Sequence, residues 1–128
     1  MKKENNQLTK AELHLMNILW DKGNATVQQI QDLLEEPKPA YTTIATFLKI
    51  LEQKGFVERR KGHTGKQLLY TPLMTRERYR LQVMDDVKQT FFDGSAASLV
   101  SFFAEADELS QEDINEILTI LQNRKVQQ

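Results

Sequence analysis

The chain has 128 residues, a formal net charge of −1 and 40% hydrophobic residues, with no cysteine and two histidines. This length suits one domain, or a small domain with a helical extension. The lack of cysteine rules out disulfides, thiol nucleophiles and thiolate metal sites, and two histidines offer little for a histidine-based metal site. No segment approaches the roughly 20 apolar residues that span a membrane, and the first residues lack the apolar stretch of a signal peptide. We therefore expect a cytoplasmic protein without a bound metal or cofactor and without membrane insertion.

Charge is divided unevenly along the chain. Residues 1–72 carry 11 Lys and Arg against 8 Asp and Glu, whereas residues 73–128 carry 6 against 10. A polyanion is therefore expected to bind the first part of the chain. The excess is small, so the function has to be sought in the pattern of particular residues.

Two capping boxes predict two short helices near the start of the chain. Thr9 followed by Glu12 predicts a helix that ends near Gly23. Thr26 followed by Gln29 predicts a second helix, which ends before a proline-containing turn. The apolar face of this second helix consists of Val27, Ile30, Leu33 and Leu34. Two short helices followed closely by a third give the layout of a helix-turn-helix.

The third predicted helix spans residues 39–55 and has two different faces. The buried face is formed by apolar residues at helical spacing, namely Ile44, Phe47, Leu48 and Leu51. The other face carries small hydroxyl groups and one cation, namely Thr42, Thr43, Thr46 and Lys49. Such a face fits a DNA groove, where hydroxyl groups reach phosphates and base edges. Capping and turn chemistry is the alternative role for these threonines.

A β-hairpin is predicted directly after the third helix. Residues 56–61 and 67–71 read as strands, and the polar loop between them is flanked by glycines. The hairpin carries four cations, namely Arg59, Arg60, Lys61 and Lys66. These cations are placed to contact the phosphate backbone beside the groove, so the first part of the chain is predicted to be a winged helix-turn-helix. Ordinary solubilising charge on a hairpin is the alternative.

Three further helices are predicted in residues 73–128. They carry more apolar side chains than they can bury against one another and against the first part of the chain. A homodimer would bury this surface, and the candidate dimerisation residues are Val87, Phe91, Phe92, Leu99, Phe102, Phe103, Ile117 and Leu121. Folding of the tail onto its own winged domain is the alternative. The predicted fold is mainly α, with a winged helix-turn-helix DNA-binding domain in residues 1–72 and a helical dimerisation domain in residues 73–128.

These motifs resemble the penicillinase repressor family, which also contains methicillin-resistance and copper-transport repressors. The resemblance spans residues 8 to about 124, nearly the whole chain. It is carried by Leu8-Thr-Lys-Ala-Glu12, Ala40-Tyr-Thr-Thr-Ile44, Lys54-Gly55, Ser98-Leu-Val100 and Leu109-Ser-Gln111.

The resemblance implies a homodimeric repressor of dyad-symmetric operators, with a winged helix followed by a helical dimerisation region. For the β-lactam branch of the family it implies relief of repression by a membrane-bound sensor metalloprotease. The scissile bond of that branch aligns with Phe102 and Phe103, with Phe102 in place of the family's Asn. Ala45 stands where the family commonly has Arg on the recognition helix. The copper branch uses cysteine pairs in its tail, and this chain has no cysteine.

The sequence as a whole predicts a DNA-binding transcriptional repressor. Two other functions stay open at this point: a protein-interaction module that uses the hairpin, and a ligand-sensing winged-helix dimer. An enzyme is not expected, because the sequence shows no nucleophile–base pair, phosphate-binding loop or metal-ligand spacing.

Overall fold

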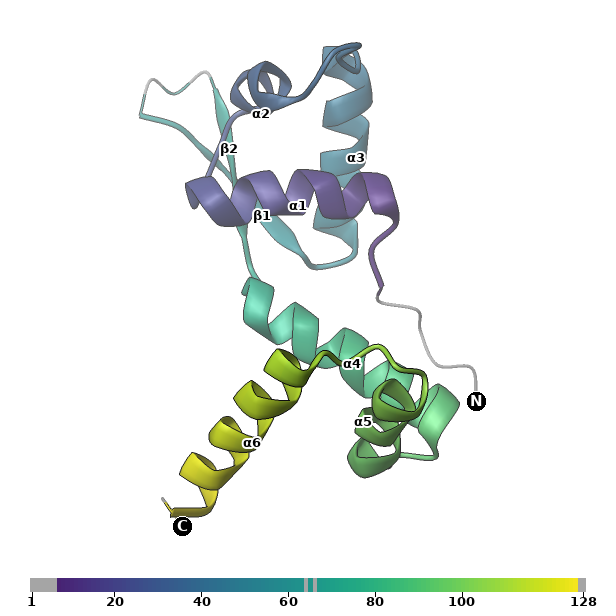
Figure 1. Ribbon diagram of the computed structural model, residues 1–128. Coiled ribbons are helices and arrows are strands. Elements are labelled where there is room, and N and C mark those ends of the chain that lie inside the picture. Colours follow the sequence, from purple (N-terminus) through teal and green to yellow (C-terminus); the bar gives the residue numbers. More distant parts are fainter. Residues whose placement is uncertain (1–6, 64, 66, 127–128) are drawn as a thin grey trace. The chain divides into compact units, whose positions relative to one another are not determined.

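The computed structural model describes residues 7–63, 65 and 67–126, and the side chains of residues up to 124 (Figure 1). The contacts within the chain divide it into two compact units, one up to Val83 and the other from Met84. The predicted boundary between independently folding domains, after residue 72, stays a prediction. No helix of the described residues is both long enough and apolar enough to cross a membrane.

The first unit consists of three helices, a two-stranded hairpin and the start of a fourth helix. These elements are α1 (Lys10–Lys22), α2 (Val27–Leu33), α3 (Tyr41–Gln53), β1 (Val57–Lys61), β2 (Leu68–Pro72) and the first turns of α4 (Arg76–Phe92). The strands pair antiparallel, from Val57 opposite Pro72 to Lys61 opposite Leu68. The segment between α1 and α2 joins the hairpin through an antiparallel bridge between Ala25 and Tyr70. The predicted mainly α fold with a winged helix-turn-helix is therefore confirmed.

The helix ends follow from the residues that cap them. Both predicted capping boxes form, Thr9 with Glu12 on α1 and Thr26 with Gln29 on α2. At the end of α3, Gly55 has a φ of 85°, which residues with a side chain rarely adopt. The amide of Gly55 donates to the carbonyl of Glu52 (3.0 Å), and the next amide donates to the carbonyl of Leu51 (2.9 Å). This is the Schellman arrangement, and it turns the chain sharply from α3 into β1.

The core of the first unit lies between α1, α2, α3 and the hairpin. Its largest fully buried side chains are Phe56, Met16, Leu19, Ile30, Ile44, Leu48, Leu51 and Val57. The prediction that Leu33 belongs to the buried face of the second helix is wrong, because Leu33 is 55% exposed. The helix α2 ends at Leu33, and the extended backbone of the next residue turns the side chain of Leu34 into the core instead.

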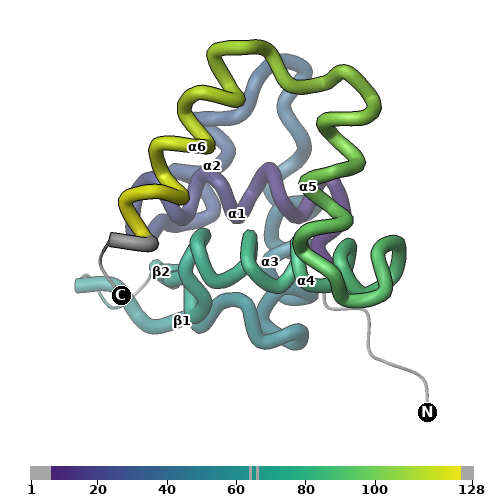
Figure 2. The backbone as a smooth tube through the Cα atoms, turned by 60° about the horizontal axis from the view of Figure 1, so that its bottom comes forward, coloured from purple at the N-terminus to yellow at the C-terminus, as the bar shows by residue number. Residues whose placement is uncertain are grey.

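The second unit contains the rest of α4 together with α5 (Ala96–Glu105) and α6 (Gln111–Val126). The amide of Ser98 donates to the hydroxyl of Ser95, which caps α5, and Ser110 and Asp113 cap α6 reciprocally. In both views α5 and α6 diverge from the turn that joins them (Figures 1 and 2).

No side chain that the structure describes in the second unit is buried. On α6, Leu118 and Leu121 are 50% and 56% exposed in the single chain. No other element of the described part of this unit covers them.

Candidate nucleic-acid interface

The helix α3 separates its apolar and hydroxyl-bearing faces. Ile44, Leu48 and Leu51 are buried against the rest of the first unit. The predicted DNA-binding residues of this helix, Thr42, Thr43, Thr46 and Lys49, are all exposed. Gln53, which the sequence analysis did not single out, is also exposed and follows Thr46 and Lys49 at helical spacing.

The three threonines differ in the hydrogen-bonding groups that they offer. The hydroxyl of Thr46 donates to the backbone carbonyl of Thr42, at 2.9 Å. This bond uses the only donor of the hydroxyl, so Thr46 presents acceptor lone pairs and its methyl group. Among the residues that the structure describes, the hydroxyls of Thr42 and Thr43 have no partner, so they remain free to donate and to accept.

A hollow of about 450 Å³ lies between α3 and the hairpin. Tyr41, Ala45, Lys49 and Glu52 line it from α3, and Arg59 lines it from β1. The four α3 residues recur at spacings of three or four, so they form a stripe along one side of the helix. This spacing is the sequence signal that would have identified Tyr41 and Glu52 as site residues.

The predicted cations of the hairpin are not equally available. The Nε of Arg59 lies 3.2 Å from a carboxylate oxygen of Glu52, and a terminal nitrogen of Arg60 lies 3.0 Å from one of Glu58. Lys49 and Lys61 are exposed and form no ion pair within the described residues. Lys66 lies outside the described residues. Among the described residues of this surface, these two lysines are thus the cations that no carboxylate compensates.

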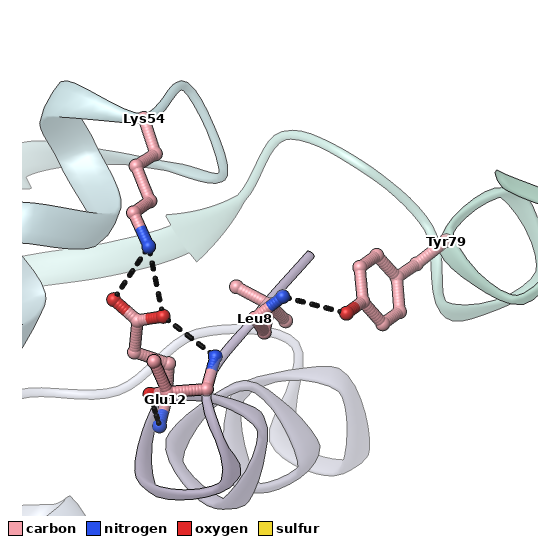
Figure 3. A network of polar contacts seen from close by, with 5 residues as sticks. Leu8, Glu12, Lys54 and Tyr79 are labelled. Carbon is pink, nitrogen blue, oxygen red and sulfur yellow. Dashed lines mark hydrogen bonds and ion pairs between the residues drawn. The ribbon is translucent and has the colours of Figure 1, made fainter. Parts of the chain in front are cut away.

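An ion pair between Lys54 and the buried carboxylate of Glu12 joins the end of α3 to the start of α1 (Figure 3). The ammonium of Lys54 contacts both carboxylate oxygens of Glu12, at 2.9 and 3.0 Å. The same carboxylate accepts a hydrogen bond from the amide of Thr9, at 2.8 Å. Burial raises the pKa of Glu12, but the hydrogen bonds from Thr9 and Lys54 outweigh it and hold the pKa below its ordinary value. The sequence indicated the capping role of Glu12 but not its pairing with Lys54.

This lowered pKa predicts that the first unit loses stability in acid. The carboxylate of Glu12 stabilises the fold fully above its ordinary pKa of about 4.3, and less as pH falls through the lower value in the folded protein. We expect Glu12→Gln to lower the free energy of unfolding at pH 7 by about 1–3 kcal/mol, because Lys54 keeps its charge without a counter-ion. Urea unfolding at several pH values tests this, and an equal loss at pH 7 and pH 3 would contradict it.

The first turns of α4 and the residues just before them contact the rest of the first unit. The amide of Leu8 donates to the hydroxyl of Tyr79, at 2.7 Å (Figure 3). The indole of Trp20 donates to the carbonyl of Met74, at 2.9 Å. The guanidinium of Arg76 lies over the Trp20 ring, 5.3 Å from its centroid. The head that carries α3 and the hairpin therefore includes the beginning of α4.

The second unit brings together most of the predicted dimerisation residues. Six of them line a hollow of about 460 Å³, namely Val87, Phe91, Phe92, Leu99, Phe102 and Phe103. The other two, Ile117 and Leu121, lie on α6 and do not line it. The ring of Phe91 is 73% exposed and that of Phe102 is 55% exposed. This is a continuous apolar surface that the described part of the chain does not cover.

Three helices, a hairpin and an exposed face on the third helix define a winged helix-turn-helix protein. The sequence matches the family described as penicillinase repressor over residues 8–123. The chain therefore belongs to the penicillinase repressor family, which confirms the resemblance in the sequence.

Individual relatives agree with this assignment. A penicillinase repressor from Bacillus licheniformis is 31% identical over 93% of this chain and 92% of its own length. The methicillin resistance regulatory protein MecI from Staphylococcus aureus (strain N315) is also 31% identical, over 93% of this chain and 95% of its own. The solution structure of the DNA binding domain of the repressor BlaI superimposes with a TM-score of 0.50 and 26% identity, and the match covers 61% of this chain and 94% of that one.

Proposed function

We propose that this protein is a transcriptional repressor that binds a dyad-symmetric DNA operator as a homodimer. The observation that supports this proposal most strongly is the exposed face of α3, with three threonines and Lys49 beside a cationic hairpin. The relatives named above are repressors, and the similar solved structure is a DNA binding domain. Binding over a promoter would exclude the polymerase. Because the operator DNA lies in the cytoplasm, the proposed activity is cytoplasmic.

In this proposal α3 enters the major groove. Lys49 and the hairpin cations, Arg59, Arg60, Lys61 and Lys66, provide the contacts to phosphates. The free hydroxyls of Thr42 and Thr43 reach phosphates or base edges, and the methyl group of Thr46 packs against a thymine methyl. Ala45 leaves the early turns without a long side chain for a bidentate contact to guanine. Sequence preference therefore rests on hydroxyl contacts, thymine methyls and DNA shape.

The second unit provides the dimer interface in this proposal. The apolar surface around Phe91 and Phe102 is the kind that a second copy covers, because a two-fold axis pairs the same patch on both protomers. Two heads then contact two half-sites, about one helical turn of DNA or a multiple of it apart.

In this proposal repression is relieved as in the β-lactam branch of the family: a membrane-bound sensor metalloprotease cuts the chain between Phe102 and Phe103. Both residues lie inside α5 and are partly exposed. A protease needs an extended backbone, so this bond becomes cleavable only when α5 opens locally. Incubation with the sensor protease and mass spectrometry of the fragments test this step, and a chain that stays intact would remove it.

Salt dependence of binding tests the proposed DNA contacts. An operator selected from randomised duplexes is titrated between 50 and 200 mM salt, and the logarithm of the affinity is expected to fall by about 0.9 per phosphate contacted for each tenfold increase in salt. We expect Lys61→Gln to flatten this slope by about 1.8 in the dimer, one contact for each head. Arg124→Gln, in the second unit, is the matched control and should leave the slope unchanged. Affinity that ignores salt, or a duplex without dyad symmetry that binds equally well, would refute the proposed function.

A further inference from the structure

Glu52 is an acidic residue in the middle of a surface that otherwise suits a polyanion. It lies on α3, lines the hollow beside Lys49, and its carboxylate contacts the Nε of Arg59 at 3.2 Å. Its side chain is 31% exposed and that of Arg59 is 52% exposed, so solvent reaches both partners. A carboxylate here repels phosphates and reduces the charge that Arg59 presents.

We propose that Glu52 competes with DNA phosphates for Arg59 and so sets a limit on the affinity of this protein for DNA of any sequence. This inference rests on the proposed function, because it concerns the strength of the same DNA contact. Before binding, Glu52 holds the guanidinium of Arg59 along the side of α3. A phosphate that approaches between α3 and the hairpin has to displace this carboxylate before Arg59 can neutralise it.

The geometry makes such an exchange feasible. The Nε of Arg59 lies 3.2 Å from a carboxylate oxygen of Glu52, and neither side chain is buried. A solvent-exposed ion pair of this kind contributes little stability, whereas a phosphate accepts two parallel hydrogen bonds from a guanidinium. Because a phosphate contact carries no sequence information, the competition acts equally on the operator and on other DNA.

The acidic residue of β1, Glu58, differs from Glu52 in its position. Glu58 pairs with Arg60, and both lie on β1, two residues apart on the same side of the strand. Glu58 does not line the hollow, whereas Glu52 joins α3 to β1 across it. Glu52 is therefore the carboxylate placed between the proposed groove-binding helix and the hairpin.

The variant Glu52→Gln tests the proposal in the full-length protein. Titrations use the selected operator and an unrelated duplex, each over a series of salt concentrations. Loss of the competing carboxylate is expected to tighten binding about two- to five-fold per head on both duplexes, the range that an exposed ion pair represents. The salt slope is expected to steepen by up to about 0.9 per head, because Arg59 then contacts its phosphate without competition from Glu52. Glu35→Gln is the matched control, with the same change of net charge on an exposed residue outside this hollow.

A second pair of variants separates competition from simple repulsion. In an Arg59→Gln background, Glu52→Gln should no longer steepen the slope. Glu52→Asp keeps the charge but withdraws the carboxylate from Arg59, so it should steepen the slope with a smaller gain in affinity.

Two results would overturn the proposal while the proposed function stands. The first is a gain from Glu52→Gln that persists without Arg59. The second is weaker binding by Glu52→Gln with an unchanged melting temperature, which would make Glu52 a residue that presents Arg59 to DNA. Failure of the unmodified protein to bind any duplex would instead refute the proposed function.

Discussion

Replacing Phe91 with aspartate is expected to convert the protein into a folded monomer that binds its operator at least about 100-fold more weakly. The ring of Phe91 is 73% exposed in the single chain, so its removal leaves no cavity. In a dimer the new carboxylate would lie among the apolar side chains around Phe102, and burial of an unpaired charge there is strongly unfavourable. Operator affinity falls because the second head loses its high effective concentration, an effect of about 10²–10⁴.

Sedimentation equilibrium measures the oligomeric state of the Phe91→Asp variant, and titration of the operator measures its affinity. The matched control is Leu33→Asp, which places the same charge on an exposed apolar residue of the first unit, a leucine on α2 that is 55% exposed. This control should remain dimeric. A Phe91→Asp variant that sediments as a dimer would show that another surface, such as that around Leu121, forms the interface.

Much of the winged unit could be predicted from the sequence because its signals are local. The capping boxes at Thr9 and Thr26 fix two helix starts through residues only three positions apart. Gly55 marks the end of α3 for an equally local reason. The exposed threonine face followed from helical spacing within a single helix. Each of these features depends on neighbours in the sequence, so no knowledge of the tertiary structure was needed.

The features that the sequence did not indicate depend on distant partners. Glu12 and Lys54 are 42 positions apart in the sequence. Arg59 contacts Glu52 only because the Schellman turn folds β1 back along α3. The exposure of Leu33 depends on where α2 ends, which is set by the extended backbone of its C-cap and not by apolar spacing. In the second unit, Ile117 and Leu121 recur at helical spacing on α6, but this spacing does not indicate what covers them.

Thr46 is expected to be the most sensitive position of the recognition face. Thr46→Asp should weaken operator binding by at least about 100-fold, because it places a carboxylate against base edges and phosphates in the groove. The side chain is exposed, so the fold should be preserved and the melting temperature should stay within a few degrees. A titration of the operator by the variant, beside circular dichroism of the free protein, measures both effects.

Two conservative variants decide what Thr46 contributes. Its hydroxyl already donates to the carbonyl of Thr42, at 2.9 Å, so the group left to face the DNA is mainly the methyl. Thr46→Val keeps a methyl there and should retain affinity within a few-fold, whereas Thr46→Ser removes it and should weaken discrimination at one thymine by about 1 kcal/mol. If the serine variant instead discriminates as well as the unmodified protein and the valine variant does not, the hydroxyl is the reading group. The hydroxyl would then either accept from a base through its free lone pairs or donate to one after the Thr46–Thr42 hydrogen bond breaks.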